Sequence, residues 1–216
     1  AWDHALTSTS AAGALFEVWW AKHLKKALWN AVVAPELHAL MVPGDVDGTL
    51  AALEAPDDRF GADPAAARNA ILLSSLGAAF AEMKTLLGPD PQGWAWGKLH
   101  HAYFQHPLAF LMPEETAKAW SIGPLPHAGS AVTPMHTGYR GTDFRTMMGS
   151  SFRLVVDLAD LDRSVTINTP GQSGDPNSPH YRDLFAKWAA GDYVPLPYST
   201  AAVEAALERK LVCKPG

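Results

Sequence analysis

Apolar residues recur every three or four positions through most of the first 87 residues, which is the spacing of one face of a helix. One such series consists of Leu15, Phe16, Trp19, Trp20, His23, Leu24 and Leu28. A second consists of Ile71, Leu72, Leu76, Phe80, Met83 and Leu87. The pattern therefore predicts a helix-rich first part, residues 1–95.

Capping residues mark the ends of these predicted helices. Ser10 stands where an N-cap is expected. Asp63-Pro64 combines a carboxylate that accepts amide hydrogen bonds with a proline that fits the first helical position. Gly88-Pro89 is a stop signal. Pro35 and the Pro43-Gly44 pair are expected to break the intervening segment into short pieces.

The pattern changes in the second part, residues 96–216, where apolar and polar side chains alternate over residues 151–158. One strand face then carries Phe152, Leu154, Val156 and Leu158, and the other carries Ser151, Arg153, Val155 and Asp157. A second strand is predicted at residues 164–169, after a turn at 160–162, and the two most simply pair antiparallel. Helices are predicted at residues 179–190 and at 200–210, the latter capped by Ser199 or Thr200.

Together these elements predict an α+β fold, with a helical first half and antiparallel strands plus helices in the second half. No internal repeat or clear linker divides the chain, so residues 1–216 are predicted to form a single unit. Two strands with a clear apolar face do not complete a sheet. Further strands are therefore expected from elsewhere in a larger parent molecule.

Composition narrows the classes of protein to consider. The chain is 48% hydrophobic and 18% charged, which is typical of globular proteins. Its net charge of -5 argues against a nucleic-acid partner. No apolar run is expected to reach the roughly 18 residues that span a bilayer, so no membrane partner is predicted. The start at Ala1, without Met or a signal segment, is typical of a processed product or a cut piece.

Three histidines close in sequence, His100, His101 and His106, suggest a metal site. Adjacent histidines on a strand point to opposite faces, so at most one of the first two joins His106. The sequence has no HExxH, no cysteine partner and no carboxylate at a suitable spacing, and no metal site is predicted. A metal hydrolase built on this region stays an alternative, which loss of activity with a chelator would support.

Nucleophile motifs give no positive signal either. No GxSxG occurs, although spacing alone leaves a Ser/His/Asp triad open, because its members meet in space. The single cysteine, Cys213, makes no internal disulfide and is a poor nucleophile candidate near the end of the chain. Residues 170–176 either cradle an anion through their amides or form a rigid connection, and the rigid connection is favoured. Arg153 either pairs with a carboxylate or meets water.

Several of these runs, taken in order, carry a resemblance. SFRLVVDL (residues 151–158), INTPGQSGDP (167–176) and SPHYRDL (178–184) closely resemble the C-terminal signature of the penicillin amidase family. YVPLPYS (193–199) is similar to the element that follows, while WGKLHH (96–101) and HPL (106–108) resemble elements upstream. Even Trp2-Asp3 before a Trp-rich helix is similar to the matching segment of the larger subunit, so the likeness covers nearly the whole chain.

The resemblance implies an N-terminal-nucleophile hydrolase of the penicillin acylase or acyl-homoserine-lactone acylase type. Such enzymes cut themselves from a precursor into two subunits, and cleavage exposes a serine whose own α-amine acts as the base. An oxyanion hole, partly from an asparagine, stabilises the tetrahedral intermediate. The implied fold is four-layered, αββα, and this chain resembles the C-terminal part of the larger subunit.

The chain departs from the family at the chemistry itself. It begins with Ala1, not serine, and the family's oxyanion asparagine and arginine lie upstream of the region it resembles. The catalytic residues are therefore expected outside this chain. Ser151 and Arg153 are candidates for positions beside the catalytic centre, and His136, Tyr139 and Arg140 for a loop on the leaving-group side. No cofactor is expected, and a structural calcium of the complete protein would have its ligands elsewhere.

The expected function is hydrolysis of linear N-acyl amides, such as β-lactam side chains or acyl-homoserine lactones, by the complete protein. The expected partners are the remaining segments or subunits of the same processed precursor and the small-molecule amide. A non-catalytic structural or binding module that retains the fold is the alternative. The family implies a periplasmic or secreted location. The chain alone is expected to be inactive and poorly behaved, because apolar faces meant for absent strands would be exposed.

Overall fold

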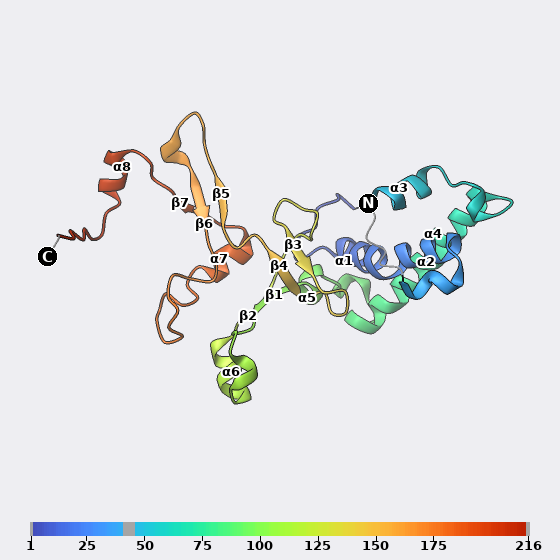
Figure 1. Ribbon diagram of the computed structural model, residues 1–216, viewed down its shortest axis with the longest axis horizontal. Helices are drawn as coiled ribbons and strands as arrows, with labels where there is room; N and C mark the ends of the chain where they lie inside the picture. Colours follow the sequence, from blue (N-terminus) through green and yellow to red (C-terminus); the bar gives the residue numbers. More distant parts are fainter. Residues whose placement is uncertain (1, 41–45, 215–216) are drawn as a thin grey trace. The chain divides into compact units, whose positions relative to one another are not determined.

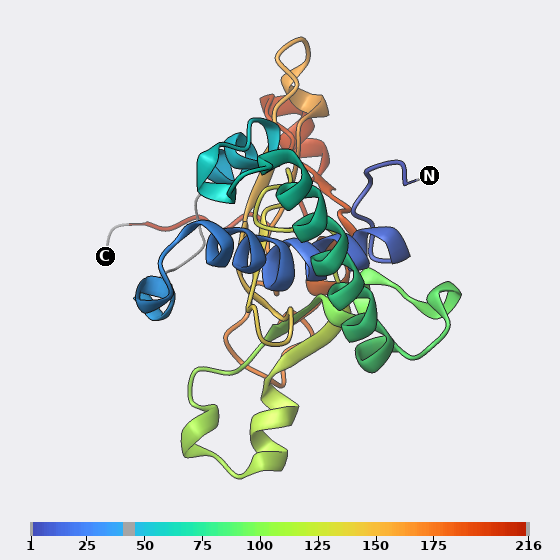
Figure 2. The ribbon, with the colours of Figure 1, turned by 90° about the vertical axis from the view of Figure 1, so that its right-hand side faces the viewer.

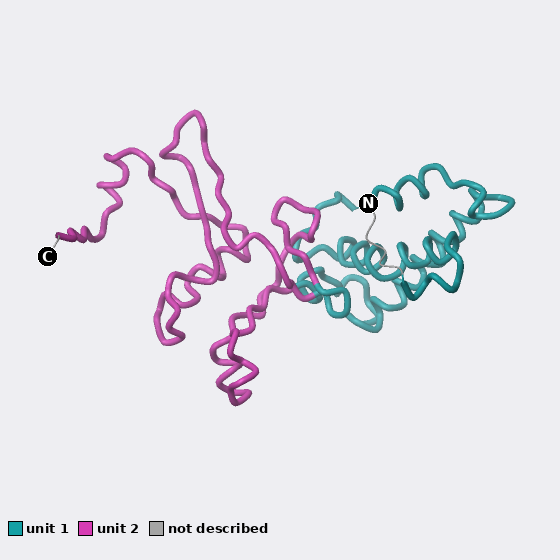
Figure 3. The backbone as a smooth tube through the Cα atoms, viewed as in Figure 1, with its two compact units in different colours: residues 1–100, 140–144 teal, residues 101–139, 145–216 magenta. Residues whose placement is uncertain are grey.

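The computed structural model describes residues 2–40 and 46–214 (Figure 1). The backbone divides into two compact units (Figure 3). The first contains the residues up to 100 together with 140–144, and the second contains residues 101–139 and those from 145 onward. The break after His100 falls near position 95, where the sequence changes from a helical to a mixed pattern. The prediction of one unit for residues 1–216 stays a prediction.

The first unit is helical. Its α-helices are α1 (Ala11–Val18), α2 (Lys25–Val32), α3 (Val46–Glu54), α4 (Pro64–Leu87) and α5 (Trp96–Leu99). A π-helical turn, η1 (Trp19–Leu24), joins α1 to α2 without a break in helical backbone angles. Short 3-10 helices complete it: η2 (Pro35–Leu40), η3 (Asp58–Phe60) and η4 (Pro91–Gly93). The α1–η1–α2 rod packs across α4 (Figure 1, Figure 2), and the indole Nε1 of Trp19 donates to Ser75 Oγ at 2.8 Å.

The predicted helix ends are confirmed where the structure describes them. Ser10 Oγ accepts a hydrogen bond from the amide of Gly13 at 2.9 Å, and Asp63 Oδ1 accepts from the amide of Ala66 at 3.0 Å. Helix α4 ends at Gly88, whose φ of 94° suits a residue without a side chain. The break expected at Pro43-Gly44 lies outside the described residues.

Helix α4 buries a narrower stripe than its sequence predicts. Ser75, Ala79 and Met83 are its buried residues, whereas Leu73 is 74% exposed and Leu76 is 38% exposed. The expectation that no apolar run is long enough to span a bilayer is wrong for this helix, because it has 24 residues and an 18-residue stretch of it has a mean hydropathy of 1.4. This stretch is 17% buried, and one such helix is weak evidence for a membrane.

In its described residues, 101–139 and 145–214, the second unit contains short strands and three α-helices. The strands are β1 (His101–Phe104), β2 (Ile122–Pro126), β3 (Thr137–Tyr139), β4 (Thr146–Gly149), β5 (Arg153–Val155), β6 (Val165–Ile167) and β7 (Val194–Pro195). They form three small antiparallel sheets, ordered β1-β2, β3-β4 and β5-β6-β7. The helices are α6 (Glu114–Trp120), α7 (Phe185–Ala190) and α8 (Thr200–Ala205), with 3-10 turns η5 (Ala109–Leu111) and η6 (Leu161–Arg163). The predicted α+β class, with a helical first half and antiparallel strands in the second, is confirmed.

The predicted hairpin forms, but its predicted apolar face is exposed, and of the other face only Arg153 is buried while Val155 is 53% exposed. Strand β5 pairs antiparallel with β6, with Arg153 opposite Ile167 and Val155 opposite Val165. Arg153 is buried, whereas the predicted core residues Phe152, Leu154, Val156 and Leu158 are 57%, 45%, 45% and 89% exposed. The strand also ends early, because Asp157 Oδ1 accepts from the amides of Ala159 and Asp160 and turns the chain.

Both predicted C-terminal helices are shorter than expected. In place of a helix over residues 179–190, only α7 forms, since the preceding segment makes turns in which the His180 carbonyl accepts from the amides of Gln172 and Ser173. Helix α8 starts at the predicted cap, with Ser199 Oγ accepting from Ala202, but ends at Ala205. Its apolar side chains Val203 and Leu207 are 43% and 50% exposed, and a short helix without packing is not sustained.

Candidate functional site

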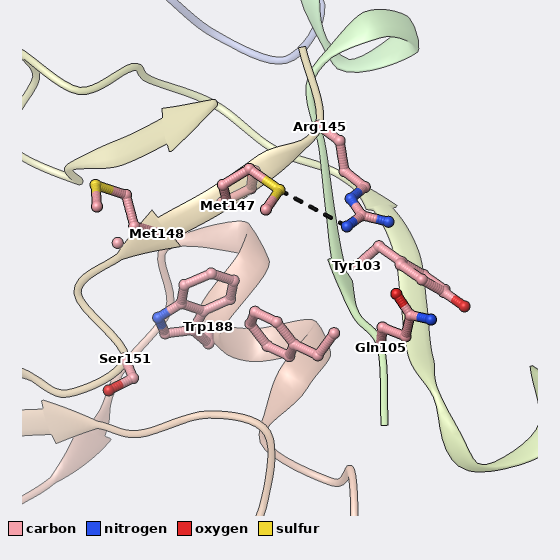
Figure 4. Close-up of a pocket in the computed structure, with 10 residues that line it drawn as sticks. Tyr103, Gln105, Arg145, Met147, Met148, Ser151 and Trp188 are labelled. Atoms are coloured by element: carbon pink, nitrogen blue, oxygen red, sulfur yellow. Dashed lines mark hydrogen bonds between the residues drawn. The ribbon is translucent and has the colours of Figure 1, made fainter. Parts of the chain in front are cut away.

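A pocket of about 370 Å³ lies in the second unit, between the end of β1, strand β4 and helix α7 (Figure 4). The following residues line it: Tyr103, Phe104, Gln105, Arg145, Thr146, Met147, Met148, Gly149, Ser151 and Trp188. They come from three separate stretches of the chain. The β1–β4 contact and the helix α7 bring these stretches together.

The floor of the pocket is aromatic and its rim carries sulfur. Trp188 is almost fully buried and packs against Phe104 with ring centroids 5.6 Å apart. Met147 and Met148 of β4 are 55% and 65% exposed. Unbranched thioether side chains adapt their shape to what they contact. The pocket therefore presents an apolar, deformable surface.

One cation borders this apolar surface. The Arg145 guanidinium lies over the ring of Tyr103 at 5.3 Å, and its Nη2 donates to the sulfur of Met147 at 3.7 Å. Figure 4 shows Arg145, Tyr103 and Gln105 on one side of the pocket and Ser151 on the other. An apolar floor with a guanidinium at its edge suits a group that has an apolar body and a neutral or anionic polar end.

Of the residues singled out in the sequence, Ser151 lines the pocket and Arg153 lies behind its wall. Arg153 Nη1 donates to the carbonyl of Trp188 at 2.9 Å, and Arg153 Nε donates to Ser150 Oγ at 3.2 Å. The guanidinium carbon is 4.6 Å from the centre of the Trp188 ring. The Trp188 indole in turn donates to the Ser150 carbonyl at 2.9 Å. Arg153 thus fixes the floor of the pocket and the backbone next to Ser151.

The electrostatic setting of Arg153 differs from both sequence interpretations, since it forms no ion pair with a carboxylate of the described residues and is only 7% exposed. Burial lowers the pKa of Arg153, and Tyr193 acts in the opposite direction. Its Nη2 is buried without a hydrogen-bond partner among the described residues. A guanidinium stays protonated even so, which makes Arg153 a buried cation held by a carbonyl, a hydroxyl and an indole ring.

The three residues assigned to a leaving-group loop do not line the pocket. His136 Nδ1 is 2.9 Å from the Ala131 carbonyl, and the His136 carbonyl accepts from the amide of Ser150 at 3.3 Å. Tyr139 ends β3, opposite Thr146 of β4. Arg140 belongs to the first unit, where it forms an ion pair with Asp143 that raises its pKa. Their role stays a prediction.

Most of the pocket was not predicted. In the sequence, Trp188 is indistinguishable from an ordinary core residue of a helix. The segment 145–149 is too short to show strand periodicity. Tyr103 and Gln105 lie between His101 and His106, in a run whose only chemical signal is its histidines. The available signal was the charge of Arg145, two positions before the Met147-Met148 pair, in a segment between Gly141 and Gly149.

The histidine cluster and the 170–176 loop make hydrogen bonds within the chain. His100 Nδ1 is 2.8 Å from the Phe144 carbonyl, and the His106 Nδ1 accepts from the amide of Leu108. Within residues 2–40 and 46–214, no three His, Cys, Asp or Glu side chains are grouped to hold a metal ion. In the loop, the amides of Gln172 and Ser173 both donate to the His180 carbonyl, which supports a rigid connection over an anion cradle.

Comparison with known proteins places these features in a family. The penicillin amidase family model matches residues 1–205. Acyl-homoserine lactone acylase QuiP of Pseudomonas aeruginosa is 36% identical over 140 residues, which are 60% of this chain and 16% of that protein. QuiP of Pseudomonas fluorescens (strain Pf0-1) is 30% identical over 209 residues, 91% of this chain and 24% of that protein. Penicillin acylase 2 proenzyme of Pseudomonas sp. (strain SE83) is 31% identical over 141 residues, 62% and 18% respectively.

Among solved structures, the thermostable penicillin G acylase from Alcaligenes faecalis is 17% identical, with a TM-score of 0.42, over 99% of this chain and 40% of that chain. The chain therefore spans about a quarter or less of the length of these curated relatives. Most of each relative's sequence has no counterpart in residues 1–216.

Proposed function

Because this chain belongs to the penicillin amidase family of amide hydrolases, we propose that it is the C-terminal part of the larger subunit of an N-acyl amide hydrolase. The observation that carries the proposal is the family match over residues 1–205, together with relatives that are named as acylases. The short span of the match supports the view that the rest of the enzyme lies outside this chain.

In the proposed enzyme, the nucleophile is the first residue of the larger subunit, a serine exposed when the precursor cuts itself. Its hydroxyl attacks the amide carbonyl, the amine leaves, and water hydrolyses the acyl-enzyme. Residues 1–216 supply part of a four-layer αββα scaffold. Ser151 and Arg153 would lie beside the catalytic centre, and the anchoring of Trp188 by Arg153 supports such a positioning role. His136, Tyr139 and Arg140 are proposed for the leaving-group side.

The proposed substrates are linear N-acyl amides, such as acyl-homoserine lactones or the side-chain amides of β-lactams. The names of the relatives, acyl-homoserine lactone acylase and penicillin acylase, support this class. We also propose a periplasmic or secreted location, which fractionation of the producing cells would test. Any structural calcium of the complete protein would take its ligands from segments outside this chain.

The test is an acylase assay on the complete gene product. The assay compares acyl-homoserine lactones of graded chain length with penicillin G. A variant with alanine in place of the N-terminal serine of the larger subunit is the control. Denaturing intact-mass analysis should find two subunits, one beginning with serine. Cleaved subunits without hydrolysis of any of these amides would instead favour a non-catalytic module that retains the fold.

A further inference from the structure

A polar groove of about 410 Å³ lies in the first unit, where the α1–η1–α2 rod crosses α4 (Figure 2). Basic and hydrogen-bonding side chains make up most of its lining, which consists of Lys22, His23, Lys26, Ala27 and Asn30 from the rod and Ser74, Ser75 and Ala78 from α4. The lining residues that the structure describes include no carboxylate. A concave site of this composition attracts an anion.

The two segments that form this groove are positively charged, although the whole chain has a net charge of -5. Residues 11–32 and 64–87 together contain five lysine or arginine residues and two glutamates. Of the glutamates, Glu17 is buried and Glu82 is engaged with Lys22 and His23. The groove therefore lies in a locally positive field, which raises the concentration of small anions near it.

A π-helical turn holds the basic wall of the groove in place. Neighbouring residues of an α-helix point about 100° apart. In η1, however, Lys22 and His23 reach the two oxygens of one carboxylate, since Lys22 Nζ pairs with Glu82 Oε1 and His23 Nε2 lies 2.6 Å from Glu82 Oε2. A π turn has more residues per turn, so neighbouring side chains diverge less, and such turns inside α-helices are frequent at functional sites. The wall is thus fixed by contacts within the chain before any ligand arrives.

Lys26 is the cation that this arrangement leaves for a ligand. It lines the groove and forms no ion pair with any residue of 2–40 or 46–214. Asn30, one helical turn further along α2, also lines the groove and brings amide N–H donors. An ammonium and an amide one turn apart can together hold the oxygens of one anion.

We propose that this groove binds a free phosphate ion, with Lys26 as its charge partner and Asn30 as a hydrogen-bond donor. The lysine ammonium is a compact point charge that commonly binds phosphate, and a tetrahedral dianion accepts hydrogen bonds from several directions. A phosphate in the groove lies between α2 and Ser74 of α4, so its binding stabilises the packing of these two helices. The site shares no residue with the pocket beside Trp188 and does not depend on the proposed acylase function.

Isothermal titration calorimetry of the complete gene product with inorganic phosphate tests the site. Sodium chloride holds the ionic strength at about 0.15 M, which screens charges beyond roughly 8 Å and keeps chloride in excess as a competing anion. Saturable binding of phosphate is expected under these conditions. The absence of saturable binding would overturn the proposal, as would binding to phosphatidylglycerol vesicles without binding of inorganic phosphate.

Two neighbouring lysines supply matched variants. Lys26→Gln should weaken phosphate binding by about tenfold or more, because it removes a charge-assisted hydrogen bond. Lys26→Arg retains the charge and should stay within about threefold of the unmodified protein. Lys25→Gln removes the same charge one residue away, where the ammonium lies 5.3 Å from the centre of the Trp20 ring and outside the groove, and screening should keep its effect within about threefold. Equal weakening by Lys25→Gln and Lys26→Gln would show general charge attraction and overturn the site.

Thermal unfolding gives a second readout. A ligand that binds only the folded state raises the unfolding midpoint. Phosphate should therefore raise the midpoint of the unmodified protein and of Lys25→Gln, and should leave that of Lys26→Gln unchanged. Because Lys26 is exposed, its substitution should not itself shift the midpoint in phosphate-free buffer. An equal rise with phosphate in Lys26→Gln and in the unmodified protein would contradict the role of Lys26.

Discussion

Arg153 shows how a single residue connects the sheet to the pocket. Its side chain is buried and donates to Trp188 and Ser150, so the wall next to Ser151 depends on the shape of the guanidinium. A planar fork of donors reaches two acceptors at once, while the ammonium of lysine is a compact point charge. Among the described residues, Arg153 forms no ion pair with a carboxylate. The geometry of its hydrogen bonds therefore decides whether another side chain can replace it.

We predict that Arg153→Lys destabilises the complete protein by about 1–3 kcal/mol, since a buried acceptor then loses its partner. Urea unfolding followed by tryptophan fluorescence measures the change. Arg163→Lys is the control, because its side chain is 74% exposed and surface substitutions stay within about 0.5 kcal/mol. Equal effects of the two substitutions would contradict the anchoring role of Arg153.

Glu82 is the residue whose charge links η1 to α4. It forms an ion pair with Lys22, and its Oε2 lies 2.6 Å from His23 Nε2. Burial acts to raise the pKa of Glu82, but the hydrogen bonds from Lys22 and His23 outweigh it and hold the pKa below its ordinary value of 4.5. A carboxyl group whose pKa is lower in the folded state stabilises that state above its unfolded pKa, and the stabilisation is lost as pH falls through the folded pKa.

We therefore predict that Glu82→Gln lowers the free energy of unfolding by about 1 kcal/mol at neutral pH, as expected for a charge-assisted, partly buried hydrogen bond. The difference from the unmodified protein should shrink as pH falls below 4.5, because the carboxylate becomes protonated. Urea unfolding at a series of pH values measures it. Glu54→Gln, at an exposed position on α3, is the control and should show no such trend. A pH-independent difference for Glu82→Gln would refute the electrostatic account.

At the scale of elements, the helices could be predicted and the sheet faces could not. Ser10 and Asp63 are local signals, since a cap depends on residues two or three positions away. The face of β5 is a tertiary property. Alternation shows that Leu154 and Arg153 lie on opposite faces, but it does not show which face α7 covers. The sequence analysis predicted that the apolar face would be the buried one. That rule holds only when a chain supplies all of its own packing partners.

The loop between β6 and α7 is an element whose rigidity can be tested. A Cβ atom on Gly171 would lie 2.2 Å from the His180 carbonyl oxygen, whereas one on Gly174 would meet nothing within 4 Å. We predict that Gly171→Ala destabilises the protein by about 1–3 kcal/mol, because backbone atoms must move apart. Gly174→Ala should change stability by less than about 1 kcal/mol. Thermal unfolding of the two variants measures the contrast, and equal midpoints would show that the loop adapts freely.

At the scale of the whole molecule, the pocket is assembled from stretches around positions 103, 147 and 188. No local sequence pattern predicts that these stretches come together. The family motif singled out Ser151, which lines the pocket, and Arg153, which contacts Trp188, but their predicted place beside a catalytic centre stays a prediction. The motifs also gave the family, which the match over residues 1–205 confirms. The proposed catalytic residues lie outside residues 1–216, so neither the sequence pattern nor the fold of this chain can locate them.

The exposed apolar surfaces lead to a prediction for residues 1–216 produced alone. Side chains such as Phe110 and Leu158 are 79% and 89% exposed, and burial of apolar area is the main driving force for association. Without the proposed precursor segments, the chain should self-associate without fixed stoichiometry and should hydrolyse neither acyl-homoserine lactones nor penicillin G. Light scattering after size-exclusion chromatography, with an acylase assay on each fraction, measures both properties. A monomer with full acylase activity would contradict the prediction, because it would show that these 216 residues contain their own nucleophile.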